Sequence, residues 1–268
     1  MGEAKYKKHR HAVLRSGKMI CIYCGERPAD TVDHMPPRMA FENKQRPDVL
    51  VFPACGVCNS ATKDNDAIVS WFSRLHYGPG FSSITPDFKK LSRGMYRYPD
   101  LTKEFRFREQ LRYVRNSRGV IVPSDLVTVD VGPITRAALE QFALKFTIAM
   151  HWHHSGEIVP ADAPIWIMGT TNYHMMTNPH IQRLLSSFKK LELMRQGAMT
   201  SAHQFAYQSE YVDKTGESVH YGVFRASFAV CGQVRPALQN SLPADSIRRR
   251  RDLLRPYPYI DISRLQDT

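Results

Sequence analysis

The feature that most constrains this chain is a pair of C-x2-C motifs near its N-terminus. Cys21 and Cys24 form the first pair, Cys55 and Cys58 form the second, and thirty residues separate the two pairs. Each pair can wrap a tight turn around one tetrahedral ion, and four thiolates are ligands that zinc prefers. We therefore expect one structural zinc site. The fifth cysteine, Cys231, lies alone in an apolar stretch and is expected to be a small buried side chain.

Metal binding is the expected use of these thiols because nothing in the sequence indicates export. No window of about eighteen apolar residues occurs, and the first fifteen residues, MGEAKYKKHRHAVLR, carry charges without the apolar segment of a signal peptide. We expect a cytoplasmic protein with no membrane partner. Cysteines stay reduced in that compartment and remain available to a metal.

The hydrophobic pattern predicts an α+β fold in three parts. Residues 1–17 are expected to form a basic N-terminal arm, residues 18–80 a zinc-containing module, and residues 81–268 a mixed accessory domain. The boundary near residue 80 is placed at Gly78-Pro79-Gly80, because glycine and proline end helices.

Apolar periodicity predicts the main elements within these parts. Helical spacing of apolar residues between Ile68 and Leu75 indicates a helix that starts after Asn59. Residues 134–152, ITRAALEQFALKFTIAMHW, are expected to form a long and largely buried helix. Residues 203–212 and 221–232 have the composition of two strands, joined around residues 213–218.

The charge balance indicates an anionic partner. The formal charge is +12 and the isoelectric point is about 9.6, so nucleic acid is the leading candidate. Residues 81–120 contain ten Lys or Arg against four Asp or Glu. Within them, Arg106 and Arg108 alternate with Phe105 and Phe107 as in a strand with one cationic face. That face can follow a phosphate backbone or can simply be solvated, and a high net charge can also serve solubility alone.

Three polar residues with catalytic potential lie between and beside the cysteines. Asp33 and His34 are adjacent, so on a strand they point to opposite faces unless a twist or bulge brings them together. Asn59 directly follows Cys58 at the expected helix start, where an Asn is also a good N-cap. Asp33 can also be a turn residue and His34 a surface histidine. A zinc ion held by the cysteines would bring all three residues close together.

The combined pattern C-x2-C … DH-x-PP … PAC-x2-CN resembles the HNH endonuclease family in its zinc-stabilised form. The resemblance covers residues 21–66 and implies a ββα-metal fold, in which a hairpin packs on a helix. It also implies that Asp33 and Asn59 bind one catalytic divalent ion, Mg²⁺ or Mn²⁺, through hard oxygen ligands. His34 would then be the general base that activates water.

The sequence departs from that family at the residue that orients the catalytic imidazole. The family often carries an Asn shortly before the second cysteine pair, whereas residues 49–52 of this chain read VLVF. A backbone carbonyl, Asp48 or Asn43 can take this role for His34.

The expected function is hydrolysis of phosphodiester bonds in DNA, with RNA as an alternative substrate. A non-catalytic, zinc-stapled nucleic-acid-binding or adaptor protein is the rival interpretation, and a homodimer is left open. Arg38 can bind the scissile phosphate or make a local salt bridge. The candidate nucleic-acid contacts are Arg38, Lys63, Arg106 and Arg108.

Two further groups of residues have alternative interpretations. Asp64 and Asp66 are expected in the first turns of a helix, where they favour the macrodipole more than they bind a metal. The cluster HWHH suggests a second metal site, although it ends an apolar helix on which only residues three or four apart share a face. Its histidines are His151, His153 and His154.

Overall fold

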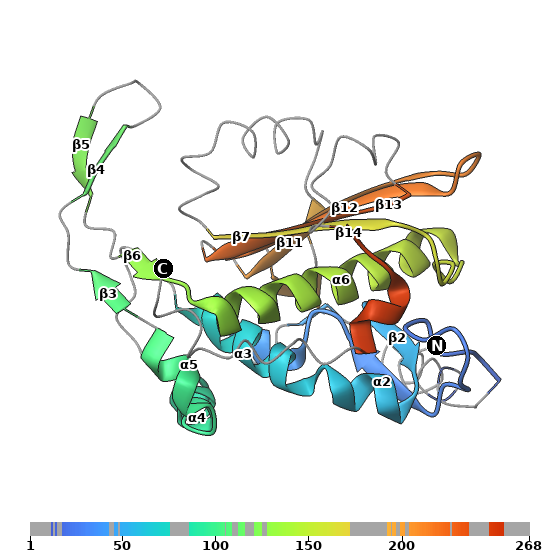
Figure 1. Cartoon of the computed structure of the whole chain (residues 1–268), viewed down its shortest axis with the longest axis horizontal. Helices are drawn as coiled ribbons and strands as arrows, with labels where there is room; N and C mark the ends of the chain where they lie inside the picture. Colours follow the sequence, from blue (N-terminus) through green and yellow to red (C-terminus); the bar gives the residue numbers. More distant parts are fainter. Residues whose placement is uncertain are drawn as a thin grey trace, which may run out of the picture.

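The structure is a computed structural model in which helices and strands are mixed, as the predicted α+β class requires (Figure 1). The residues that it describes are 12, 14, 18–42, 46–47, 49–75, 86–104, 106–108, 112–115, 121–124, 128–171, 192–193, 195–196, 199–201, 204–225, 227–235 and 247–254. Most of the predicted basic arm, residues 1–17, lies outside this set, as do residues 76–85.

The largest described sheet has six antiparallel strands in the order β14-β7-β13-β12-β11-β8. Alternate residues of one strand face opposite sides, so Ile167 enters the main core while Trp166 and Met168 pack on the other face. The strands are β7 (Ile165–Thr171), β8 (Glu192–Leu193), β11 (Phe205–Val212), β12 (Glu217–Phe224), β13 (Phe228–Val234) and β14 (Ile247–Arg248).

The single strand predicted over residues 221–232 is wrong, because the chain reverses in the middle of it. β12 ends at Phe224 and β13 begins at Phe228, and between them Arg225 has a left-handed φ of 51°. The reversal stacks the rings of Phe224 and Phe228 with centroids 4.6 Å apart. The segment contains no glycine or proline at the turn, so the sequence carries no local turn signal there.

The long buried helix predicted over residues 134–152 is present as α6 (Pro133–Ser155), which runs along one face of the sheet (Figure 1). At the start of α6, the N–H groups of Ile134 and Thr135 have no acceptor within the helix, and they donate hydrogen bonds to the Glu104 carboxylate. The helix approaches the sheet closely, since a Cβ added to Gly222 of β12 would lie 2.8 Å from Phe146 Cζ.

The cysteine-containing part of the chain packs on the other side of α6, so α6 lies between this part and the sheet (Figure 1). The helix predicted after Asn59 begins earlier than expected, at Gly56, and is interrupted at Thr62. The elements of this part are β1 (Thr31–His34), η1 (Arg38–Ala40), β2 (Val51–Ala54), α2 (Gly56–Ala61) and α3 (Lys63–Arg74). β1 and β2 pair as an antiparallel two-stranded sheet.

One hydrophobic core joins these layers. Phe72 of α3 lies 5.9 Å from Phe228 of β13, and Phe41 lies 6.2 Å from Phe205 of β11, both between ring centroids. One buried cluster contains residues from both parts of the chain, for example Cys21 and Leu253. The predicted boundary near residue 80 falls outside the described residues and stays a prediction, but the parts on its two sides share this core.

The segment predicted to be a basic strand does contain strands. Residues 106–108 form β3, which pairs with β6, while β4 and β5 pair with each other; residues 116–120 between them lie outside the described residues. Nothing is described of the side chains of Arg106 and Arg108. The remaining elements are α4 (Pro86–Met95), α5 (Pro99–Glu104), β3 (Arg106–Arg108), β4 (Arg112–Arg115), β5 (Ile121–Ser124), β6 (Thr128–Asp130), β9 (Arg195–Gln196), β10 (Met199–Thr200) and η5 (Arg250–Leu254).

Candidate functional site

Four cysteine sulfur atoms meet in a buried cluster, as the two C-x2-C motifs predict. The Sγ atoms of Cys21, Cys24, Cys55 and Cys58 all lie within 4.8 Å of one another, and those of Cys24 and Cys55 are 4.0 Å apart. Sulfur ligands about 2.3 Å from a tetrahedral zinc ion lie ~3.8 Å from each other. The four donors therefore need only small shifts to hold one ion, and soft thiolates suit zinc.

Local backbone geometry explains how each pair presents its sulfur atoms. After Cys24 the chain turns at Gly25, whose φ of 66° favours glycine, and the Gly25 N–H donates to Cys21 O at 2.8 Å. The second pair lies on the start of a helix, because Cys55 is the N-cap of α2 and Cys58 is in its first turn. Each pair is therefore brought together by local structure: the first pair by a turn, and the second by the start of a helix.

Hydrogen bonds among the thiols distribute the protons of the cluster unevenly. A hydrogen bond from Cys58 lowers the pKa of Cys21 to about 5, and the same contact raises the pKa of Cys58. One thiolate is thereby stabilised by neighbouring thiol donors. A divalent ion would replace these protons, so metal binding releases them.

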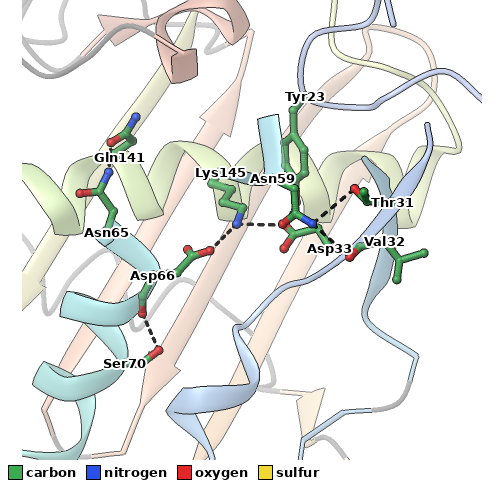
Figure 2. Close-up of polar contacts among 10 residues, drawn as sticks. All are labelled: Tyr23, Thr31, Val32, Asp33, Asn59, Asn65, Asp66, Ser70, Gln141 and Lys145. Atoms are coloured by element: carbon green, nitrogen blue, oxygen red, sulfur yellow. Dashed lines mark hydrogen bonds and ion pairs between the residues drawn. The ribbon is translucent and has the colours of Figure 1, made fainter. Parts of the chain in front are cut away.

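The Asp33 side chain points into the interior, towards α6 (Figure 2). The Tyr23 hydroxyl donates to Asp33 Oδ2 at 2.5 Å, and Lys145 Nζ lies 3.0 Å from the same oxygen. Burial and the charge of Asp33 raise the pKa of Tyr23, which keeps its hydroxyl protonated as a donor. Tyr23 lies between the two cysteines of the first pair, so the turn that carries Cys21 and Cys24 itself contacts Asp33.

The Asn59 side chain lies against β1 and does not cap a helix. Asn59 is inside α2, and its Nδ2 donates to Thr31 Oγ1 at 3.3 Å and to Val32 O at 3.4 Å (Figure 2). Val32 O belongs to the peptide group that precedes Asp33. The N-cap interpretation of Asn59 is therefore wrong, and with its nitrogen engaged the amide presents Oδ1 as the remaining acceptor.

His34 lies on the more exposed side of β1 and contacts Arg38. The two residues are four apart, and Arg38 NH2 is 3.0 Å from His34 Nε2. A guanidinium only donates hydrogen bonds, so Nε2 is the acceptor in this contact. Val51 and Phe52 at the family's usual Asn position are buried strand residues, and Asn43 and Asp48 lie outside the described residues. The structure thus brings Asn59 to the peptide group before Asp33 and Arg38 to His34, while Asp33 faces the interior and His34 the more exposed side of β1.

Lys145 and Asp66 are the residues that sequence reasoning missed. Lys145 is fully buried in α6, and its Nζ lies 2.6 Å from Asp66 Oδ2 as well as 3.0 Å from Asp33 Oδ2 (Figure 2). Asp66 is in the first turn of α3, as predicted, but its side chain is buried and paired with Lys145 rather than exposed. One signal was available: a lysine in an otherwise apolar buried helix needs a charged partner.

The remaining candidates have clear positions. Lys63 is exposed at the first residue of α3, close in sequence to Asn59, and Arg38 is also exposed. Asp64 is exposed and accepts a hydrogen bond from the Tyr98 hydroxyl at 2.7 Å. Cys231 is buried in β13, as predicted.

The HWHH histidines are not gathered around a metal in the described part of the chain, where the four cysteines form the group of metal donors. His151 Nδ1 lies 2.8 Å from Ser218 Oγ, and His220 Nε2 lies 2.9 Å from the same hydroxyl. The ring of His154 stacks on that of His220. This end of α6 is therefore a buried hydrogen-bond network between imidazoles and hydroxyls.

The network makes stability depend on pH. Burial lowers the pKa of His151 from 6.5 to about 4 and that of His220 well below 6.5. Because both imidazoles bind protons more tightly when unfolded, their contribution is complete above pH 6.5 and is lost as pH falls towards 4. Asp66 acts in the opposite direction, since burial raises its pKa to about 6. We expect the free energy of unfolding of His220→Gln to fall less than that of the unmodified chain as the pH is lowered over this interval. Urea unfolding at several pH values measures this difference, and parallel curves would contradict it.

No protein-family model, curated protein or solved structure matches the chain. Within the described residues, no helix is long and apolar enough to cross a membrane.

Proposed function

We propose that this protein is a metal-dependent HNH endonuclease that hydrolyses phosphodiester bonds in DNA. The observation that carries the proposal is that each cysteine pair delivers one side chain to the surroundings of Asp33. Tyr23, between Cys21 and Cys24, donates to its carboxylate, and Asn59, next to Cys58, donates to the peptide group before it. A zinc ion on the cysteines would thus organise the proposed catalytic residues directly.

The local fold supports the proposal. The antiparallel pair β1 and β2 is followed directly by α2 and α3, in the order that a ββα-metal module requires. Asp33 and His34 lie on the first strand, and Asn59 lies on the first helix. These are the elements on which the HNH resemblance expects them.

Two hard oxygen donors are suited to a divalent ion such as Mg²⁺ or Mn²⁺. Both donors that contact Asp33 lie at Oδ2, so its Oδ1 would be the metal ligand. The Asn59 amide uses its nitrogen for hydrogen bonds, so its Oδ1 would be the second ligand. The thiolates would hold zinc, so ligand softness separates the two metals. When bound, the divalent ion would stabilise charge on the scissile phosphate and on the leaving oxygen.

His34 would act as the general base through Nε2. In the free protein this nitrogen accepts a hydrogen bond from Arg38. A DNA phosphate would draw the exposed guanidinium of Arg38 to itself, because charge-assisted bonds to phosphate are stronger than a bond to neutral imidazole. Nε2 would then be able to accept a proton from the attacking water, and cleavage would leave 5′-phosphate ends.

The charge of +12 supports a nucleic-acid substrate. Arg38 and Lys63 are exposed near the site, and Arg106 and Arg108 would extend the contact along the backbone. The enzyme would work in the cytoplasm, where its thiols stay reduced.

His34→Ala is expected to reduce cleavage about 10²- to 10⁴-fold, because it removes the general base. Supercoiled plasmid, linear duplex and RNA are incubated with the full chain and Mg²⁺ or Mn²⁺, and products are followed on gels. His154→Ala, exposed at the end of α6, is the matched control and should cut like the unmodified chain.

Each rival function has its own result in the same assay. A protein that shifts DNA but cuts nothing, equally with or without His34, would be a non-catalytic binding protein. Cleavage of RNA alone would change the substrate and keep the chemistry.

A further inference from the structure

The buried ammonium of Lys145 is the part of this site that neither the motif nor the HNH resemblance accounts for. Its side chain is fully buried, and Nζ contacts Asp66 and Asp33 at 2.6 and 3.0 Å (Figure 2). Burial lowers the pKa of Lys145, but the two carboxylates raise it by more, so the group stays charged. An ammonium without such partners would be very unfavourable in the interior.

The contacts of Asp33 converge on one oxygen. Tyr23 donates to Oδ2 at 2.5 Å and Lys145 lies 3.0 Å from it, whereas no described residue donates to Oδ1. Two donors on one oxygen restrict rotation of the carboxylate. The other oxygen is then held ready for a ligand beside Asn59, whose amide nitrogen is bonded to the preceding peptide group.

The ammonium does not neutralise the site. Asp33 and Asp66 carry two negative charges against the one positive charge of Lys145, which leaves one negative charge in a buried cluster. Asp66 Oδ1 is itself buried without a hydrogen-bond partner among the described residues. A cation next to Asp33 would therefore still be attracted, although Lys145 is close.

We propose that Lys145 is a positioning residue of the nuclease site: anchored on Asp66, its ammonium holds the Asp33 carboxylate in the orientation that binds the divalent ion. The inference rests on the proposed function. It adds that the site is completed by α6, far outside the 21–66 motif, so that the motif alone would hold Asp33 through Tyr23 only. Partners of this kind typically change metal affinity or activity about 10- to 100-fold when they are removed.

The test is the Mn²⁺ concentration that gives half-maximal cleavage by the full chain. Lys145→Met is expected to raise this concentration about 10- to 100-fold, with zinc content retained. Asp66→Asn keeps the ammonium but weakens its anchor, so it should shift the same value in the same direction by less. This second variant carries the test if Lys145→Met does not fold.

Arg74→Met is the matched control, because it removes another buried cation, paired with Glu42 at 3.5 Å, from the helix that carries Asp66. It should lower the melting temperature and leave the Mn²⁺ dependence unchanged. Lys145 variants that melt earlier but keep the normal Mn²⁺ dependence would overturn the inference, since the residue would then be structural only.

The results are different if the proposed nuclease function itself is wrong. If the unmodified chain cuts nothing, Mn²⁺ binding is measured directly by electron paramagnetic resonance. Weaker binding by Lys145→Met would then support the positioning role at a metal site without nuclease activity, and equal or absent binding would overturn it.

Discussion

Removing the metal from the cysteine cluster is expected to unfold the part of the chain that contains β1, β2 and α2. Structural zinc sites in small modules bind with apparent free energies of about 10–16 kcal/mol, and this energy is coupled to folding. The four cysteines are buried and hold a turn and a helix start together. Cys58→Ser, or a strong chelator, should remove the contribution of this part to the cooperative unfolding transition of the chain. Metal analysis should find one zinc ion per unmodified chain and much less in the variant.

Cys231→Ala is the matched control for this experiment. Cys231 is as buried as the cluster cysteines but lies alone in β13, so its replacement should leave the zinc content unchanged. A chain that keeps its circular dichroism spectrum and melting temperature without metal would show that the cluster does not need an ion to fold.

Phe228→Ala is expected to destabilise the whole described fold by about 3–5 kcal/mol, the usual range for removal of a buried aromatic ring. Its ring is fully buried, and its centroid lies 4.6 Å from that of Phe224, 5.9 Å from that of Phe72 and 6.2 Å from that of Phe142. These neighbours belong to the sheet, to α3 and to α6. Loss of the ring should therefore lower the stability of the cysteine part and of the sheet together, in one urea transition.

Tyr96→Ala removes an aromatic ring that is 79% exposed and should change the urea midpoint little. Two separate transitions, with only the sheet affected by Phe228→Ala, would contradict a shared core. They would instead favour the division near residue 80 that the sequence predicts.

Patterns that depend on neighbouring residues were predicted well. The four metal donors, the long helix α6 and the strand β11 follow from spacing and from apolar periodicity, which act over a few residues. The errors occur where long-range packing overrides local preference. Helix α2 begins before Asn59, at Gly56, whose N–H donates to the Asp30 carboxylate 26 positions away, and the chain reverses between Phe224 and Phe228, whose rings stack.

The contacts of the proposed catalytic residues are likewise of two kinds, those within one short segment and those between distant segments. His34 and Arg38 are four residues apart, and their contact involves one short segment. The partners of Asp33 could not be predicted from the motif. Lys145 meets Asp66 from 79 positions away, and it reaches Asp33 only because α6 packs between the sheet and β1.

The sequence by itself therefore determined the residue types that the proposed chemistry needs: four soft donors that could hold one metal, with a carboxylate, an imidazole and an amide close to them along the chain. Only the tertiary structure decided that Asp33 faces inwards to a buried ammonium and that Asp66 anchors it. The physical reason is that ligand types and their spacing are local properties of the chain. A buried charge on a strand pairs with a counter-ion on the helix that packs against that strand, and the packing of the whole core determines which helix that is.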